Sequence, residues 1–250
     1  MKKLLTVLLA VGLLFALGAC NKADNEPAGD ETPTTDNEVK VMSHAEYMAA
    51  DLETEVNVEC YVQAHQSWWE DKVTVYAADE DGAYFIYQMA CSEEDAAKLT
   101  AGTKIRVHGY KDEWSGEIEI MDATFEIIEG NYVADAVDVT ALLGSDELID
   151  HQNEFVSFTG LTVVAADESG AAFLYNWDGS GSHESNSDLY FNVSDGTNTY
   201  TFTVESYLTG NDTDVYAAVE ALQVGDVVDM TGFLYWYNGV NPHIVSVVVK

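Results

Sequence analysis

The stretch Leu99-Thr-Ala-Gly102-Thr-Lys-Ile105-Arg-Val107-His-Gly109, followed by Trp114 and Gly116, occurs a second time in this chain. The second copy reads Leu222-Gln-Val-Gly225-Asp-Val-Val228-Asp-Met230-Thr-Gly232, followed by Trp236 and Gly239. The three glycines of each copy stand seven residues apart, and the second set lies 123 residues after the first. Each copy predicts a helix that ends at a left-handed glycine, then an alternating strand and an aromatic hairpin. The repeat therefore predicts a duplicated domain.

The length agrees with this duplication, since 250 residues hold one or two domains. We place the first domain at residues 41–131 and the second at residues 132–250. Either part is long enough to bury a core of its own.

The elements around the repeat also come in pairs. Alternating strands are predicted at 56–62 and 156–162, and hairpins at 73–87 and 189–204. Short helices are predicted at 93–99, capped by Ser92, and at 213–222, capped by Asn211 or Asp212. A helix over 41–52 begins with the capping box Ser43 and Glu46, and 139–149 is its weaker counterpart. The second copy carries an insertion that includes the glycine- and serine-rich segment 178–188, which predicts an exposed loop.

The order of three strands, a helix and two strands, found twice, resembles the OB-fold. The resemblance implies an all-β protein with small helical content, built of two tandem five-stranded barrels, each with a helix between strands three and four. It also implies that ligands lie across strands two and three, between the loops that join strands one to two and four to five.

The amino-terminal residues predict export. Met1 to Lys3 form a charged region, and Leu4 to Leu17 form an apolar run too short for a typical membrane span. The run ends in Leu17-Gly-Ala-Cys20, which resembles the lipobox of bacterial lipoproteins. On that resemblance residues 1–20 are a signal peptide, and acylated Cys20 anchors the protein to a membrane. Residues 21–40 are polar and predict a disordered tether.

The charge is strongly negative. There are 44 acidic residues against 10 lysines and arginines, a formal net charge of -34, and neither lysine nor arginine occurs between Asp112 and Val249. Such a chain repels nucleic acid and anionic membranes over long range. We therefore expect no nucleic acid among its partners.

No pattern of residues predicts catalysis. The chain lacks a nucleophile elbow, a phosphate-binding loop and a zinc-protease motif, so we expect neither an enzyme nor a cofactor. The acidic groups at 79–81 and 212–214 do not have the spacing of an EF-hand, and turn chemistry explains them better than a metal site. Lys104, Arg106 and His108 form a small basic stripe that we interpret as a solvated strand face. Cys60 and Cys91 either pair in a disulfide or are buried separately.

The candidate ligand-binding residues are aromatic and fall at loops. They are Trp68, Trp69, Trp114, Tyr235, Trp236 and Tyr237. Exposed flat rings bind sugars, peptides or bases by stacking, although such rings can also cover the ends of a barrel.

We expect a lipid-anchored extracytoplasmic, non-catalytic binding or scaffold protein, whose ligand is a neutral molecule such as an oligosaccharide, or a protein partner. The alternative is an OB-fold protein that binds single-stranded nucleic acid, which the fold by itself does not establish.

Overall fold

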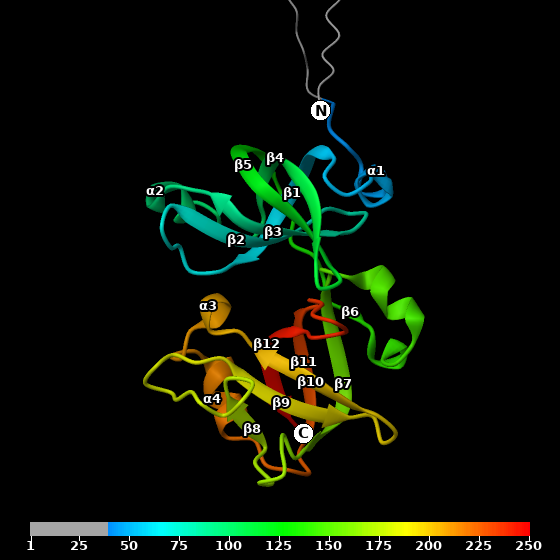
Figure 1. Ribbon diagram of the computed structural model, residues 1–250, viewed down its shortest axis with the longest axis vertical. Helices are drawn as coiled ribbons and strands as arrows, with labels where there is room; N and C mark the ends of the chain where they lie inside the picture. Colours follow the sequence, from blue (N-terminus) through cyan, green and yellow to red (C-terminus); the bar gives the residue numbers. More distant parts are fainter. Residues whose placement is uncertain (1–39) are drawn as a thin grey trace, which may run out of the picture. The chain divides into compact units, whose positions relative to one another are not determined.

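The computed structural model describes residues 40–250 (Figure 1). The predicted signal peptide, the lipidation of Cys20 and the tether up to Val39 lie outside the described residues and stay predictions. Among the described helices, none combines the length and the apolar character that crossing a bilayer requires.

The first half of the described chain forms a closed barrel of five strands. These are β1 (Glu55–His65), β2 (Lys72–Ala78), β3 (Ala83–Ala90), β4 (Thr103–Trp114) and β5 (Glu117–Asn131). They pair in the order β1-β2-β3-β5-β4, and β4 closes onto β1 (Figure 1). Helix α1 (His44–Ala49) precedes the barrel, and α2 (Glu93–Ala96) lies between β3 and β4. The capping box of Ser43 and Glu46 and the cap at Ser92 are confirmed.

The second half repeats this barrel. Its strands are β7 (Phe155–Val164), β9 (Leu189–Ser194), β10 (Thr199–Val204), β11 (Val227–Phe233) and β12 (His243–Val249). The ring closes because β9 also pairs with β7. The short strands β6 (Val137–Asp138) and β8 (Phe173–Tyr175) extend the sheet at its edges, and α3 (Ser206–Thr209) and α4 (Asp214–Glu220) lie between β10 and β11. The predicted fold class of two tandem OB-like barrels is confirmed.

Two local predictions need correction, and the two alternatives for Cys60 and Cys91 are decided. Residues 139–149 form no α-helix but two 3-10 helices, η1 (Thr140–Leu142) and η2 (Asp146–His151), because Gly144 adopts a left-handed φ of 79° between them. Helix α4 is preceded by Thr213 without a side-chain cap. The Asn211 side chain, expected to cap α4, instead donates to the His183 carbonyl at 2.7 Å. Cys60 and Cys91 are both buried as free thiols.

The paired glycines serve the same purpose in both barrels. Gly102 and Gly225 adopt left-handed φ values of 90° and 101° before the fourth strand of their barrels. At Gly109 a Cβ would stand 2.7 Å from the Met121 carbonyl oxygen, and at Gly232 it would overlap the His243 carbonyl oxygen. The fourth and fifth strands approach too closely there for any side chain.

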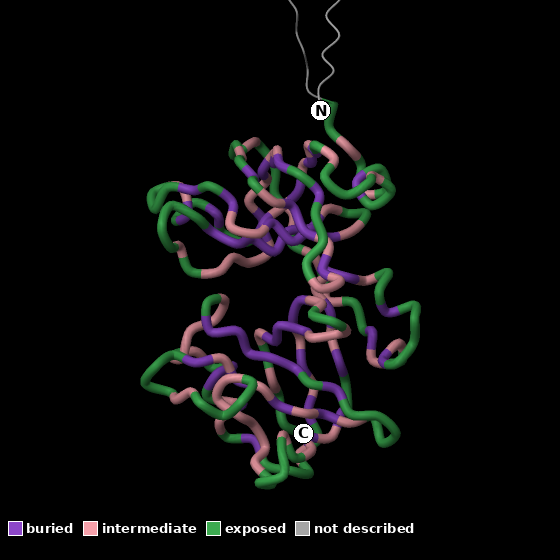
Figure 2. Tube along the Cα trace, viewed as in Figure 1, coloured by how far each residue is buried: buried purple, intermediate pink, exposed green. Residues whose placement is uncertain are grey.

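Each barrel has its own apolar core. On β1 every second residue from Val56 to Val62 is buried, as its alternating sequence predicts. Figure 2 shows buried segments along the strands of both barrels and exposed segments at the connecting loops. The larger fully buried side chains include Tyr84 and Ile86 in the first barrel, and Phe158 and Phe202 in the second.

A third apolar cluster joins the two barrels. Tyr76 and Phe85 of the first barrel pack with Phe233 of the second, and the rings of Tyr76 and Phe233 stack with centroids 4.6 Å apart. The Tyr76 hydroxyl and Nδ1 of His243 form a buried hydrogen bond of 2.6 Å. Part of the outer face of β2 and β3, around Tyr76 and Phe85, is therefore buried against the second barrel.

Polar side chains form a second junction between the barrels. The Trp236 backbone amide donates to Oε2 of Glu117 at 2.8 Å, and Gln152 Nε2 donates to the Gly116 carbonyl at 2.7 Å. Asn153 Nδ2 donates to the Ile118 carbonyl at 3.1 Å. Glu117 is fully buried, and burial raises its pKa to about 9, so this junction holds a protonated carboxyl group at neutral pH.

Candidate ligand-binding cleft

Two adjoining cavities lie where the barrels meet, and together we call them the interbarrel cleft. The Trp69 subsite has a volume of about 470 Å³ and the Tyr235 subsite about 790 Å³, sizes typical of small-ligand sites. Gln66, Tyr87 and Glu205 line both. The Trp69 subsite is completed by Ser67, Trp69, Lys72, Val73, Thr74, Gln88 and Tyr207. The Tyr235 subsite is completed by Phe85, Trp114, Ala166, Leu174, Trp177, Tyr190, Asn192, Thr201, Thr203, Tyr235, Tyr237, Asn241 and His243.

The cleft is where the ligand-binding faces expected of both barrels come together. The first barrel contributes its β1–β2 loop, strands β2 and β3, and the β4–β5 hairpin. The second barrel contributes β9 and β10, the long β7–β9 connection and the β11–β12 loop. These are the surfaces that OB-folds use for ligands. One cleft therefore takes its walls from two such surfaces.

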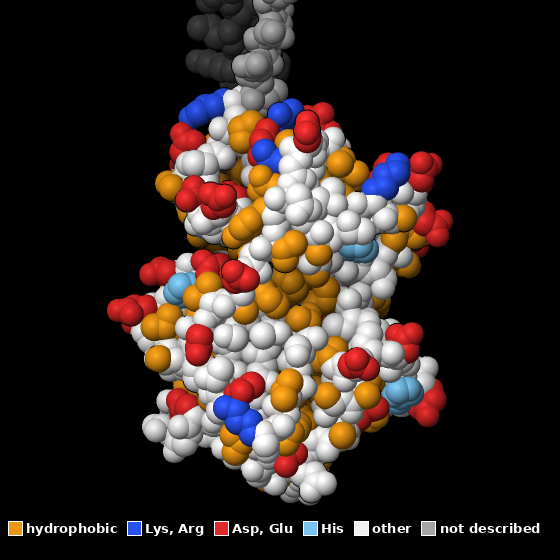
Figure 3. All heavy atoms as spheres, turned by 180° about the vertical axis from the view of Figure 1, so that it is seen from behind, with side chains coloured by type: hydrophobic (Ala, Val, Ile, Leu, Met, Phe, Trp, Pro, Cys, Tyr) orange, Lys and Arg blue, Asp and Glu red, His pale blue; other side chains and the backbone are white. Residues whose placement is uncertain are grey.

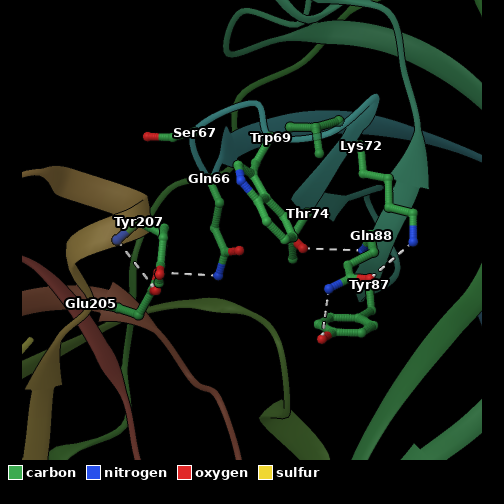
Figure 4. A pocket seen from close by; sticks show the side chains of 10 residues that line it. Gln66, Ser67, Trp69, Lys72, Thr74, Tyr87, Gln88, Glu205 and Tyr207 are labelled. Atoms are coloured by element: carbon green, nitrogen blue, oxygen red, sulfur yellow. Dashed lines mark hydrogen bonds between the residues drawn. The ribbon is translucent and has the colours of Figure 1, made fainter.

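The Trp69 subsite has aromatic walls and a polar floor (Figure 4). Trp69 is 62% exposed and Tyr207 is 63% exposed, so both rings are available for stacking. A chain of hydrogen bonds orients the polar groups of the floor: Lys72 Nζ donates to Gln88 Oε1 at 3.3 Å, and Gln88 Nε2 donates to the Tyr87 hydroxyl at 2.9 Å. The β1–β2 loop is held to the second barrel because the Ser67 amide donates to the Tyr207 carbonyl at 2.7 Å.

The Tyr235 subsite is built on packed rings. Tyr235 stacks on His243 with ring centroids 4.3 Å apart, and its ring centroid lies 5.2 Å from that of Phe85. Burial lowers the pKa of His243 to about 3, so the imidazole is neutral at physiological pH. Trp114, Trp177 and Tyr237 surround these rings and are 59%, 76% and 52% exposed.

One carboxylate lies where the subsites meet. Glu205 follows β10 and is 8% exposed. Its Oε2 accepts from Gln66 Nε2 at 3.1 Å, across the barrel junction, and its Oε1 accepts from the Tyr207 amide at 3.3 Å. Burial, with a smaller contribution from Asp188, raises the pKa of Glu205 to about 7.

The cleft also contains one ammonium group. Residues 40–250 include seven lysines and arginines, and Lys40, Lys98, Lys104, Arg106 and Lys250 each form an ion pair with a carboxylate. Lys111 is buried and donates to the carbonyls of Met48 and Ala50. Within this part of the chain, Lys72 is thus the one exposed cation without an acidic partner. Acidic side chains are spread over the face of the molecule that Figure 3 draws.

The basic stripe predicted from the sequence is a set of ion pairs. Lys104 and Arg106 both contact Glu59, at 2.7 Å each, and His108 Nε2 lies 2.7 Å from Glu55 Oε1. Hydrogen bonds from Lys104 and Arg106 lower the pKa of Glu59. The stripe is therefore neutralised by its own strand neighbours and lies outside the cleft.

The structure brings four of the six predicted aromatic residues into the cleft and leaves two outside it. Trp69, Trp114, Tyr235 and Tyr237 line the subsites. Trp68 instead packs on the core of the first barrel, and its Nε1 donates to the Cys91 carbonyl at 2.8 Å. Trp236 packs on the core of the second barrel and against Gly116. Ligand binding by these residues stays a prediction.

Several lining residues were not foreseen from the sequence. They are Gln66, Phe85, Tyr87, Trp177, Tyr190, Glu205, Tyr207 and His243. A signal for two of them was present, since alternation in Tyr84-Phe-Ile-Tyr87 places Phe85 and Tyr87 on the face opposite the core. The others come from the second barrel or from loops, and only the packing of the barrels brings them together.

No protein-family model and no curated protein matches the chain. Among solved structures it is similar to the p204 HINb domain, at 14% identity and a TM-score of 0.36, over 80% of this chain and 100% of that one. It is also similar to the Ifi202 HINa domain in complex with 20bp dsDNA, at 12% identity and a TM-score of 0.33, over 80% and 96% of the two chains. The p202 HIN1 domain in complex with 12-mer dsDNA matches at 14% identity and a TM-score of 0.35, over 81% and 94%.

Two predictions made from the sequence are corrected against these comparisons. One was an extracytoplasmic binder of a neutral ligand or a protein, and the other was that nucleic acid is not a partner. Both predictions are wrong. The finding that contradicts them is the set of similar solved structures in complex with double-stranded DNA. The error came from the use of net charge. A charge of -34 is a sum over the whole chain, whereas the side chains that line the cleft include one glutamate and one lysine.

Proposed function

We propose that this protein is a non-catalytic module that binds single-stranded nucleic acid and holds unpaired bases in the interbarrel cleft. One observation carries the proposal. The surfaces that OB-folds use for ligands meet, one from each barrel, in a single cleft lined by aromatic rings and side-chain amides. Bases present flat faces for stacking and polar edges for hydrogen bonds, and this cleft offers both kinds of partner.

Stacking would supply most of the affinity. Trp69 and Tyr207 expose their rings in one subsite, and Trp114, Trp177 and Tyr237 do so in the other. Each stacked base contributes roughly 1 to 3 kcal/mol in single-strand-binding proteins. Three stacked bases at the upper end of this range supply about 9 kcal/mol, and micromolar affinity needs about 8 kcal/mol.

Lys72 is the residue we assign to a phosphate. It is exposed at the Trp69 subsite, and its neighbour Gln88 is neutral. Because one cation contacts the backbone, about one counterion is released, and log K should fall with log salt at a slope of about -0.7. Proteins that grip several phosphates have much steeper slopes, so this shallow dependence separates binding through bases from binding through the backbone.

The test is a titration of the full chain with labelled single strands of mixed sequence, and with their duplexes, followed by fluorescence anisotropy. We expect single strands to bind more tightly than duplexes, because duplex bases are already stacked and paired. Trp69→Ala should weaken binding by about 5-fold to 150-fold, the loss of one stacked base. Tyr110→Ala is the matched control, an exposed ring on β4 that lies outside the cleft.

Lys72→Gln should weaken binding and flatten the salt dependence, whereas Lys98→Gln removes a cation that is already paired with Glu94 and Asp95 and should leave binding unchanged. Absence of binding to every strand would refute the proposal. Equal affinity of Trp69→Ala and the unaltered protein would show that the cleft is not the site.

A further inference from the structure

A carboxylate and a carboxamide lie side by side where the two subsites join. Glu205 and Gln66 come from different barrels, line both cavities, and are bonded to each other at 3.1 Å (Figure 4). The pair is polar, while Trp69, Tyr87 and Tyr235 among the other lining residues are aromatic. Trp69 and Tyr87 line the same subsite as this pair, so a ligand stacked on either ring enters the subsite that holds the pair.

The charge of Glu205 decides which atoms of this pair donate and which accept hydrogen bonds. An ionised carboxylate only accepts, so the Gln66 amide must turn its nitrogen toward Glu205. That nitrogen carries two hydrogens, and one remains after the bond to Glu205. Each Glu205 oxygen accepts one protein hydrogen bond and keeps further lone pairs. The edge offered to a ligand is therefore a donor followed by two acceptors.

Only one of the common bases has the complementary edge. Guanine presents O6 as an acceptor and then the N1 and N2 hydrogens as two donors. Uracil and thymine present one donor between two acceptors, and cytosine presents one donor followed by two acceptors. Adenine presents one donor and one acceptor. Guanine is thus the base that matches the pair at all three positions.

We propose that the interbarrel cleft selects guanine, with Glu205 accepting from N1–H and N2–H and Gln66 donating to O6. The inference rests on the proposed function and adds the identity of the base to it. Glu205 is the one carboxylate among the residues that line the cleft. A carboxylate disfavours a phosphate at this position and favours a neutral base edge with two adjacent donors.

Glu205 has a structural task that the experiment must separate from recognition. Its Oε1 accepts from the Tyr207 amide at the start of α3. Gln66 has no bond to that helix other than through Glu205. Gln66→Ala therefore removes the donor to O6 while the cap of α3 is kept, and it complements Glu205→Gln, which replaces one acceptor by a donor.

The experiment uses the full chain and single strands that differ at one central position in a thymine tract. The position holds guanine, 7-deazaguanine, hypoxanthine, adenine or cytosine, and affinities are measured by anisotropy at about pH 8, where the Glu205 carboxylate is ionised. We expect guanine to bind about 5-fold to 150-fold more tightly than adenine or cytosine. Hypoxanthine, which lacks the N2 amino group, should lose part of this preference. 7-Deazaguanine keeps the same edge and should match guanine.

Two variants test whether the preference for guanine depends on Glu205 and Gln66. Glu205→Gln and Gln66→Ala should bring the affinity for the guanine strand down to that for the adenine strand. Glu147→Gln, at an exposed acid outside the cleft, should keep the full preference. If strands bind but guanine shows no advantage, or if both variants keep the preference, this inference is overturned while the proposed function stands. If no strand binds, the proposed function itself fails.

Discussion

Replacing Glu117 by glutamine should remove a large part of the pH dependence of stability. Glu117 is fully buried at the barrel junction, where Oε2 accepts from the Trp236 amide and Oε1 has no hydrogen-bond partner. Oδ1 of Asn153, whose amide nitrogen donates to the Ile118 carbonyl, is likewise buried without a donor. A proton on Oε1 turns this unpaired buried acceptor into a donor. Burial accordingly raises the pKa of this carboxyl group to about 9.

The magnitude follows from proton linkage. In the unfolded chain the Glu117 carboxyl ionises with a pKa of 4.5, and in the folded protein at about 9. Between these values the folded state holds one more proton than the unfolded state. The resulting stability is full below pH 4.5 and is lost, at about 1.4 kcal/mol per pH unit, as the pH rises toward 9. From pH 6 to pH 8 the loss is about 3 kcal/mol.

The assay is urea denaturation of the full chain and of Glu117→Gln across this pH range. Glutamine supplies the same donor permanently, so we expect the free energy of unfolding of the variant, relative to that of the unaltered protein, to rise by about 3 kcal/mol between pH 6 and pH 8. Subtracting the two curves removes the contributions of Glu119 and Glu205, whose pKa values burial also raises, each to about 7. Glu129→Gln, at an exposed position on the same strand, should give no such rise. Parallel curves for Glu117→Gln and the unaltered protein would refute a protonated carboxyl group at the junction.

Three further predictions concern the fold and the amino terminus. Gly109→Ala should destabilise the protein by about 1 to 3 kcal/mol, because its Cβ would press on the Met121 carbonyl; an unchanged denaturation midpoint would contradict the close approach. The fragment 41–131 should fold alone, since it contains a complete barrel and core; circular dichroism of an unfolded fragment would show that the barrels depend on each other. Cys20→Ala should release the protein from membranes or block its maturation, as membrane fractionation will show; unchanged processing would contradict lipidation.

The strand pattern was readable from the sequence because it depends on local chemistry. The alternation from Val56 to Val62 decides which side chains face the core, and the left-handed glycine at 102 marks the turn into β4. Such signals are contained in a few neighbouring residues. The helix predicted at 139–149 was wrong for the same reason, since its apolar residues gave the right spacing while Gly144 broke the backbone.

The candidate site was only partly readable. Exposed aromatic residues at loops indicated Trp69, Trp114, Tyr235 and Tyr237, but identical reasoning selected Trp68, whose indole is used to bond the Cys91 carbonyl. Whether a loop tryptophan faces a ligand or its own core depends on contacts with distant residues, and the loop sequence does not contain them.

The sequence by itself therefore determined the duplication, the strand order and the two closed barrels, because glycine placement and side-chain alternation act within each repeat. Only the tertiary structure decided that the two ligand faces share one cleft. Gln66 and Glu205 are 139 residues apart in the chain and meet at 3.1 Å, and Tyr76 reaches His243 across the same junction. These contacts arise from the packing of one folded barrel on another, which depends on the shape and burial of both surfaces at once.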